Sequence, residues 1–194
     1  MEPKLQPPGA GLPLPQKLIL RLIIGPFQSK ITPWNVSRTR YEKLTSKIIE
    51  AAEAVPLEKR KTKILVDPII GLEDSSRYWS VDMLLEHLMI VGKNMEAIIL
   101  SLSNGVKPNV VADTAKVKPT AASGDHSTQN ILFEFKAYAP TLMQNLDLMM
   151  KNRDSDTTLK HPWFGECNAR QWYFVLAAHQ GIHWQQLKQI IEKL

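Results

Sequence analysis

The spacing of apolar side chains along the chain is typical of amphipathic helices. Four segments carry apolar residues every three or four positions, the period that places them on one face of a helix. These segments run from about residue 37 to 55, 80 to 104, 127 to 150 and 168 to 193. No convincing alternation of apolar and polar residues indicates a strand. The pattern predicts an all-α fold, a four-helix bundle with long connections.

Residues that favour helix ends agree with these bounds. Ser80 is a preferred N-cap before the second segment. Asn168, with a glutamine three positions later, has the spacing of a capping box before the fourth. The Asn-Gly pair at 104–105 is a common C-terminal signal. Pro140 lies inside the third segment, where it has no N–H to donate and is expected to kink or interrupt the helix.

The first 33 residues differ from the rest because they are rich in proline. We therefore divide the chain into a Pro-rich arm, residues 1–33, which we expect to pack on the bundle, and a bundle domain, residues 34–194. The apolar run Leu18–Phe27 is too short to span a membrane and contains Arg21, so we expect no stable membrane insertion. Two alternatives stay open for the arm: an anchor on a membrane surface and a contact that forms a homodimer.

Composition and charge narrow the class of protein. With 194 residues, 44% of them hydrophobic and 22% charged, the chain has the size and balance of one globular domain. Its single cysteine, Cys167, excludes an internal disulfide and a cysteine-based zinc site. The N-terminus lacks the layout of a signal peptide, so we expect a cytoplasmic protein. The net charge of +5 is modest and no basic region is interleaved with aromatic residues, so we expect no nucleic-acid partner.

Two histidines occupy the apolar face of the last helical segment. His179 and His183 are four positions apart, which places their Cβ atoms about 5–6 Å apart on one side of a helix. His87 borders the apolar face of the second segment. If these two helices are neighbours, three imidazoles can hold one metal ion and leave a position open for water or substrate. Imidazole suits zinc, nickel, copper and iron, so these residues alone do not identify the metal.

A second interpretation of these histidines stays open, because a histidine on an apolar face is often a hydrogen-bonded core residue. The pair is not a zinc-protease motif, since that motif needs a glutamate directly after the first histidine and this chain has Gln180 there. Cys167 precedes the last helix, whose dipole could lower the pKa of its thiol. No histidine is placed to activate this thiol, so we expect it to be inert.

The chain resembles the DinB/YfiT-like superfamily of metal-dependent enzymes over roughly residues 37–193. The resemblance rests on three motifs, of which the third is the most specific. They are Trp79-Ser80 followed by Leu84-Leu85-Glu86-His87-Leu88; Val117-Lys118-Pro119; and His161-Pro162-x-Phe164-Gly165 followed by Trp172, His179, His183 and Gln186.

The resemblance implies a fold, a cofactor and a range of activities. It implies a four-helix bundle in an up-down-down-up arrangement and one divalent metal, nickel or zinc, held by His87, His179 and His183. Family members with known activity include S-transferases and isomerases that use small thiols such as bacillithiol or mycothiol. The long Pro-rich arm and the long loop before Trp79 depart from the simpler members and could reshape the mouth of a pocket. The substrate is therefore not carried over.

Two functions follow as hypotheses. The first is a metal-dependent enzyme that acts on a small molecule, by thiol S-transfer or by hydrolysis. Its pocket would be lined by Tyr41, Phe135 and Tyr138 on the inward faces of the first and third helices. His161, which opens the HPWFG turn, would fix that turn and contribute to the pocket. The alternative is a non-catalytic stress-response or binding protein in which the metal is structural or absent.

Overall fold

The computed structural model describes residues 2–119 and 128–194, without the side chains of residues 25, 26 and 128–130. The described chain is mainly helical, which confirms the predicted α class. The α-helices are α1 (Leu14–Ile19), α2 (Ser29–Ile31), α3 (Trp34–Ala54), α4 (Val81–Ser103), α5 (Thr128–Tyr138), α6 (Leu142–Met149) and α7 (Ala169–Glu192). The segment η1 (Leu20–Gln28) has i→i+5 hydrogen bonds, and η2 (Leu57–Lys59) and η3 (Asp74–Ser76) are short 3₁₀ turns.

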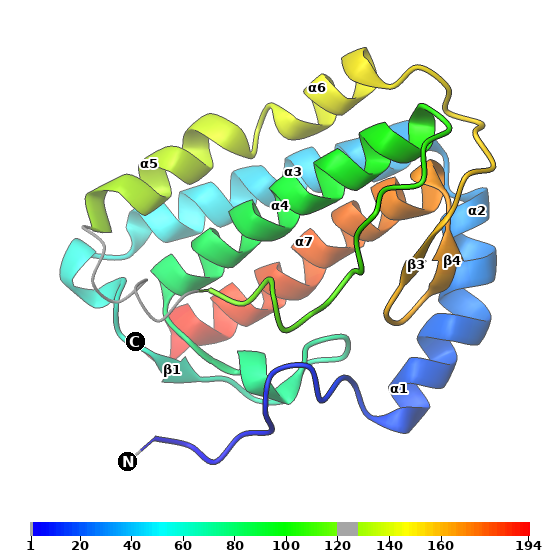
Figure 1. The fold of residues 1–194 in the computed structure, drawn as a ribbon. Helices are drawn as coiled ribbons and strands as arrows, with labels where there is room; N and C mark the ends of the chain where they lie inside the picture. Colours follow the sequence, from blue (N-terminus) through cyan, green and yellow to red (C-terminus); the bar gives the residue numbers. More distant parts are fainter. Residues whose placement is uncertain (1, 120–127) are drawn as a thin grey trace.

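The long helices pack around a shared core. Helix α7 contacts both α3 and α4, while α5 and α6 lie over α3 and α4 on the opposite side (Figure 1). Two short antiparallel ladders connect the helices: β1 (Ile64–Leu65) with β2 (Tyr78–Trp79), and β3 (Leu159–His161) with β4 (Gly165–Cys167). The sequence pattern did not indicate these strands, because strands of two or three residues are too short to display an alternation.

The predicted helix ends agree with the structure in most places. The Ser80 side chain accepts a hydrogen bond from the backbone N–H of Met83 at 3.2 Å, and Asn168 forms the predicted capping box with Gln171. The third predicted helix is interrupted around Pro140, giving α5 and α6. The first begins at Trp34 rather than near Ser37, which lies buried inside α3. Pro33 explains the earlier start. A proline disfavours helical geometry in the residue before it, here Thr32, and is itself well suited to the start of a helix.

The core consists of two apolar clusters that meet along α4 and α7. Leu84 belongs to one cluster and Val91 to the other, and His87 lies between them, about one turn from each. On α7, Ala177 belongs to one cluster and Leu187 to the other, again with histidines between them. The three histidines therefore lie between the two apolar clusters, at matching heights on the neighbouring helices α4 and α7.

The N-terminal helical segment lies beside the β3–β4 hairpin, across one end of the long helices (Figure 1). Leu12 and Leu20 are buried, and Ile24 packs against the core cluster that includes Trp172. The Ser29 hydroxyl accepts a hydrogen bond from the Gln171 side-chain amide at 3.1 Å, at the start of α7. One face of the segment is thereby held on the body of the protein. Within the described residues, no helix is both long enough and apolar enough to cross a membrane.

Candidate metal centre

Three histidine side chains from two helices converge on one point. The Nε2 atom of His179 lies 3.2 Å from Nε2 of His87 and 3.1 Å from Nε2 of His183. One ring nitrogen of each residue falls within 4.8 Å of the other two. Because α4 and α7 pack side by side, the condition that the sequence set for a shared site is met. His87 and His183 are buried, and His179 is partly buried.

A backbone carbonyl fixes the tautomer of His87. Its Nδ1 lies 2.6 Å from the carbonyl oxygen of Val117. A carbonyl only accepts hydrogen bonds, so Nδ1 must carry the proton and donate it. The neutral ring then has its lone pair on Nε2, the atom that faces the other two histidines. Val117 lies in an irregular segment far from α4 in sequence, so a loop sets the protonation of this side chain.

A glutamine fixes His183 in the same way. Its Nδ1 lies 2.8 Å from Oε1 of Gln186, one turn further along α7. The orientation of the Gln186 amide is fixed, because its Nε2 donates to the carbonyl of Ser76 at 2.7 Å and exchanging Oε1 with Nε2 would break this hydrogen bond. His183 therefore also keeps its proton on Nδ1 and directs an unprotonated Nε2 at His179. Such outer hydrogen bonds are characteristic of histidines that bind metals.

Burial keeps the three rings neutral. It lowers the pKa of His183 to about 4 and lowers the pKa values of His87 and His179 well below the usual histidine range. The neighbouring histidines and the Lys118 ammonium lower the pKa of His179 further. Neutral imidazole is the form that binds metal ions. At neutral pH the three side chains are thus ready ligands.

The close approach of the three Nε2 atoms is compatible with a shared metal ion. Two lone pairs that face each other repel, and the single proton of His179 can relieve only one of the two Nε2–Nε2 contacts at a time. A zinc ion with nitrogen ligands at 2.0–2.1 Å in a tetrahedral arrangement sets those nitrogens about 3.3 Å apart. The two separations that involve His179, 3.1 and 3.2 Å, are close to that value, and all three nitrogens lie within 4.8 Å of one another. The three histidines are therefore close enough together to bind one metal ion.

Trp79 packs against this centre from strand β2. Its ring is parallel to that of His183, at an angle of 7° with centroids 5.9 Å apart, and its centroid is 4.9 Å from that of His87. The Lys118 ammonium lies over the same indole, 5.7 Å from the ring centroid. The indole thus limits the rotation of two of the candidate ligands.

A cavity of about 580 Å³ adjoins the three histidines. Its walls come from α4, α7 and three connecting segments, residues 71–76, 108–118 and 161–163. Much of the wall is apolar, with Val91, Met95, Ile98 and Trp172 among its side chains. A cavity of this size and character can enclose a small organic molecule beside the histidines.

A buried ion pair joins two of the connecting segments at the cavity wall. The Lys118 ammonium lies 2.7 Å from a Glu73 carboxylate oxygen and donates to the Ser76 hydroxyl at 2.5 Å. The Thr114 hydroxyl donates to the other Glu73 oxygen at 2.8 Å. Burial alone would raise the pKa of Glu73, but the hydrogen bond and charge of Lys118 outweigh it and lower that pKa. The apolar periodicity does not indicate this pair, because both residues lie outside the regular helices and strands.

His161 lines the same cavity but has the opposite tautomer. Its Nδ1 accepts hydrogen bonds from the backbone N–H groups of Trp163 at 3.1 Å and Phe164 at 3.3 Å. Nδ1 is therefore unprotonated, and the neutral ring carries its proton on Nε2. Burial lowers the pKa of His161 to about 3, which keeps the ring neutral. The predicted role in fixing the turn is confirmed, and the remaining N–H is available as a donor.

The other three residues predicted for the pocket lie in the core. Tyr41 and Phe135 are almost fully buried, and the Tyr138 hydroxyl donates to Glu96 at 3.2 Å. Among the described residues, none of the three belongs to the wall of this cavity. Their inward faces pack against other helices, whereas the cavity lies under the connecting segments. A substrate contact by these residues stays a prediction.

The surroundings of Cys167 agree with the expectation of an unreactive thiol. The thiol is buried, and this burial raises its pKa to about 12, with the Glu166 carboxylate adding to the effect. Desolvation therefore outweighs any help from the nearby helix N-terminus.

The fold and the site define the class of the protein: it is mainly helical, with three histidines close enough together to bind a metal ion. No protein-family model matches the chain, and neither a curated protein nor a solved structure matches it. The functional argument therefore rests on the site.

Proposed function

We propose that the protein is a metal-dependent enzyme that holds one divalent cation on His87, His179 and His183 and acts on a small molecule in the adjoining cavity. The observation that carries this proposal is the fixed tautomer of two of the three rings. Nδ1–H of His87 donates to the Val117 carbonyl and Nδ1–H of His183 donates to the Gln186 amide oxygen, so that unprotonated Nε2 atoms face one point. A hydrogen bond at Nδ1 alone would also suit a core histidine, but here the two bonds direct both Nε2 lone pairs at the same neighbouring ring.

The assignment to the DinB/YfiT-like superfamily is part of the proposal. Residues from each of its three motifs meet around the candidate metal centre. Trp79 packs against the rings, Val117 holds His87 by its carbonyl, and Gln186 holds His183. Within this proposal α3, α4, α7 and the interrupted pair α5–α6 are the four members of the bundle.

The chemistry we propose is thiol S-transfer or hydrolysis with nickel or zinc. A divalent cation held by His87, His179 and His183 would supply Lewis acidity beside the cavity. The apolar wall around Met95 and Ile98 suits the hydrocarbon part of a substrate. His161 supplies a hydrogen-bond donor through Nε2–H, and its low pKa keeps it a donor of constant charge. The Glu73–Lys118 pair holds the covering segments in place.

The proposal is tested by measuring the metal content of the purified protein by elemental mass spectrometry. The wild type should contain about one nickel or zinc ion per chain, and His87→Ala and His179→Ala should contain none. His161→Ala is the matched control, because it removes a buried histidine of the same cavity that is not a ligand. It should keep the metal.

Two results would contradict this function. Protein reloaded with zinc and with nickel that binds neither would leave the histidines as core residues. Equal metal content in wild type, His87→Ala and His179→Ala would place the metal elsewhere. If the metal binds as expected, the loaded protein is assayed for transfer of small thiols and for hydrolysis, with His179→Ala as the blank.

A further inference from the structure

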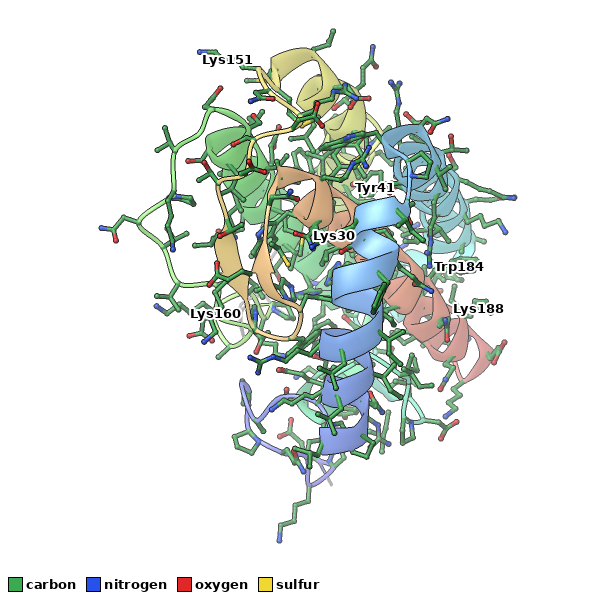
Figure 2. All side chains as sticks on the ribbon, turned by 90° about the vertical axis from the view of Figure 1, so that its right-hand side faces the viewer. Lys30, Tyr41, Lys151, Lys160, Trp184 and Lys188 are labelled. Atoms are coloured by element: carbon green, nitrogen blue, oxygen red, sulfur yellow. The ribbon has the colours of Figure 1, made fainter. Side chains whose placement is uncertain are left out.

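The outward face of the N-terminal helical segment is apolar. In the continuous run α1–η1–α2, large apolar side chains recur four positions apart in two adjacent rows. The rows are Leu14, Leu18 and Leu22, and Ile19, Ile23, Phe27 and Ile31, with 49–74% of each side chain exposed. Residues four apart lie on one face of a helix, so the two rows form a wide stripe. Figure 2 shows this segment at the front of the molecule, facing away from the core.

The stripe is not the face that the segment uses to pack. That role belongs to Leu20, Ile24 and Ser29, which contact the body of the protein. A helix in water normally presents polar residues opposite its packed face. Here the opposite side is apolar as well, and no described segment covers it. An exposed apolar patch of this kind marks an interaction surface.

The charge of this region is of one sign. Residues 3–41 contain six basic residues and no aspartate or glutamate. Three of the six, Lys17, Arg21 and Lys30, belong to the helical segment itself. The surface thus combines a wide apolar stripe with positive charge beside it, the combination found in helices that lie on anionic membranes.

We infer that the run Leu14–Ile31 docks on an anionic lipid surface, with its apolar stripe in the interfacial layer. Its basic residues would contact the lipid headgroups. The helix would lie on the bilayer and not cross it, in agreement with the absence of a spanning helix in the described residues. This inference is independent of the proposed metal chemistry.

A second copy of the chain is the less suitable occupant. A two-fold dimer contact is formed by the same patch on both copies. Joining two such patches would bring Lys17, Arg21 and Lys30 of one copy near their equivalents, with no acidic residue of the segment to compensate. Anionic lipid supplies the missing negative charge.

Vesicle flotation tests the inference with the full chain. Two kinds of vesicle are compared: phosphatidylcholine alone, and phosphatidylcholine mixed with phosphatidylserine. We expect binding to the mixed vesicles that weakens with added salt, and little binding to the neutral ones. Phe27→Asp and Arg21→Glu should each weaken binding by about tenfold. Phe133→Asp on α5 and Lys61→Glu are the matched controls, because both residues are exposed and lie outside the segment.

Circular dichroism should show that Phe27→Asp is folded, since the side chain that it replaces is 64% exposed. The inference is overturned if wild type binds neither kind of vesicle, or binds both equally. It is also overturned if Phe27→Asp binds as well as Phe133→Asp. Sedimentation that finds a dimer dissociated by Phe27→Asp, without vesicle binding, would assign the stripe to a second copy.

Discussion

Two kinds of histidine lie side by side at the cavity, and they differ in the atom that carries the proton. In His87 and His183, Nδ1–H donates a hydrogen bond to a carbonyl or amide oxygen, so the lone pair is on Nε2. In His161 two backbone N–H groups occupy Nδ1, so the proton is on Nε2. Burial lowers the pKa in all three, so charge does not distinguish them.

The difference shows that the hydrogen-bond partner of Nδ1 decides what a buried histidine can do. When Nδ1 donates to an acceptor, Nε2 has a lone pair that can bind a cation. When Nδ1 accepts from a donor, Nε2 carries the proton and can donate a hydrogen bond. Residues of both kinds line the same cavity, so a bound molecule could meet a cation and a hydrogen-bond donor there. This comparison yields three predictions, and a buried carboxyl elsewhere on α4 yields a fourth.

The largest effect is expected from metal removal. In the wild type, free metal at about one hundred times its Kd adds about 2.7 kcal/mol of stability, which raises Tm by about 5–10 °C in a chain of this size. His87→Ala should show no such shift on adding metal, and His161→Ala should show all of it. Thermal melts with and without a chelator measure this. A chelated wild type that is unfolded at room temperature would instead indicate a structural metal, as in the alternative hypothesis.

The next effect comes from Asp82, a buried carboxyl to which the described structure gives no hydrogen-bond partner. It is 1% exposed, and neither carboxylate oxygen has a partner among the described residues. Burial raises its pKa to about 6, against the opposing charges of Arg60 and Lys61. Because the folded-state pKa is above the unfolded one, stability is greatest below about pH 4 and is lost as pH rises through about 6.

Asp82→Asn removes this titration and should be more stable than wild type at high pH. Relative to wild type, its free energy of unfolding should rise by about 2 kcal/mol between about pH 4 and pH 8. Urea unfolding at the two pH values measures the change. Asp156→Asn, at an exposed loop position, is the control and should differ from wild type by the same amount at both. If the difference in free energy of unfolding between Asp82→Asn and wild type were the same at both pH values, the carboxyl would have a hydrogen-bond partner after all.

A smaller effect is expected when the tautomer of one ligand is no longer fixed. Gln186→Leu fills a similar volume but removes the acceptor for Nδ1 of His183. Loss of such an outer contact typically weakens metal binding by about 10–100-fold. Competition with a chromogenic chelator measures the affinity. Gln185→Leu, at the exposed neighbouring position, should leave it unchanged, and an unchanged affinity in Gln186→Leu would show that the tautomer is not controlled by this contact.

The features that could be predicted from the sequence are those located on the long helices. The caps at Ser80 and Asn168 and the break at Pro140 depend on short-range backbone chemistry, which is readable from neighbouring residues. The trio of histidines was also readable, since its members lie beside or on apolar faces of two helices. Whether α4 and α7 are neighbours was not, because that depends on packing between distant segments.

The partners of these histidines could not be predicted from spacing. Val117, Ser76 and the Glu73–Lys118 pair lie in irregular segments that carry no periodic pattern, and their positions follow from the folded whole. Periodicity placed Tyr41 on an inward face, and this is why it was predicted as a pocket residue. Inward-facing side chains fill the core, whereas the cavity forms where connecting segments cover the helices.

The smallest effect separates the two functions of His161. His161→Asn keeps an acceptor near the position of Nδ1 and removes the donor at Nε2, while His161→Gln keeps a donor and removes the acceptor. We expect His161→Asn to retain the Tm of the wild type and to bind an oxygen-donor probe, acetohydroxamate, about tenfold more weakly in the zinc-loaded state. His161→Gln should lower Tm and keep the affinity for the probe. Calorimetric titration and thermal melts measure both, and equal losses of affinity in the two variants would remove the donor role and leave His161 as a turn residue.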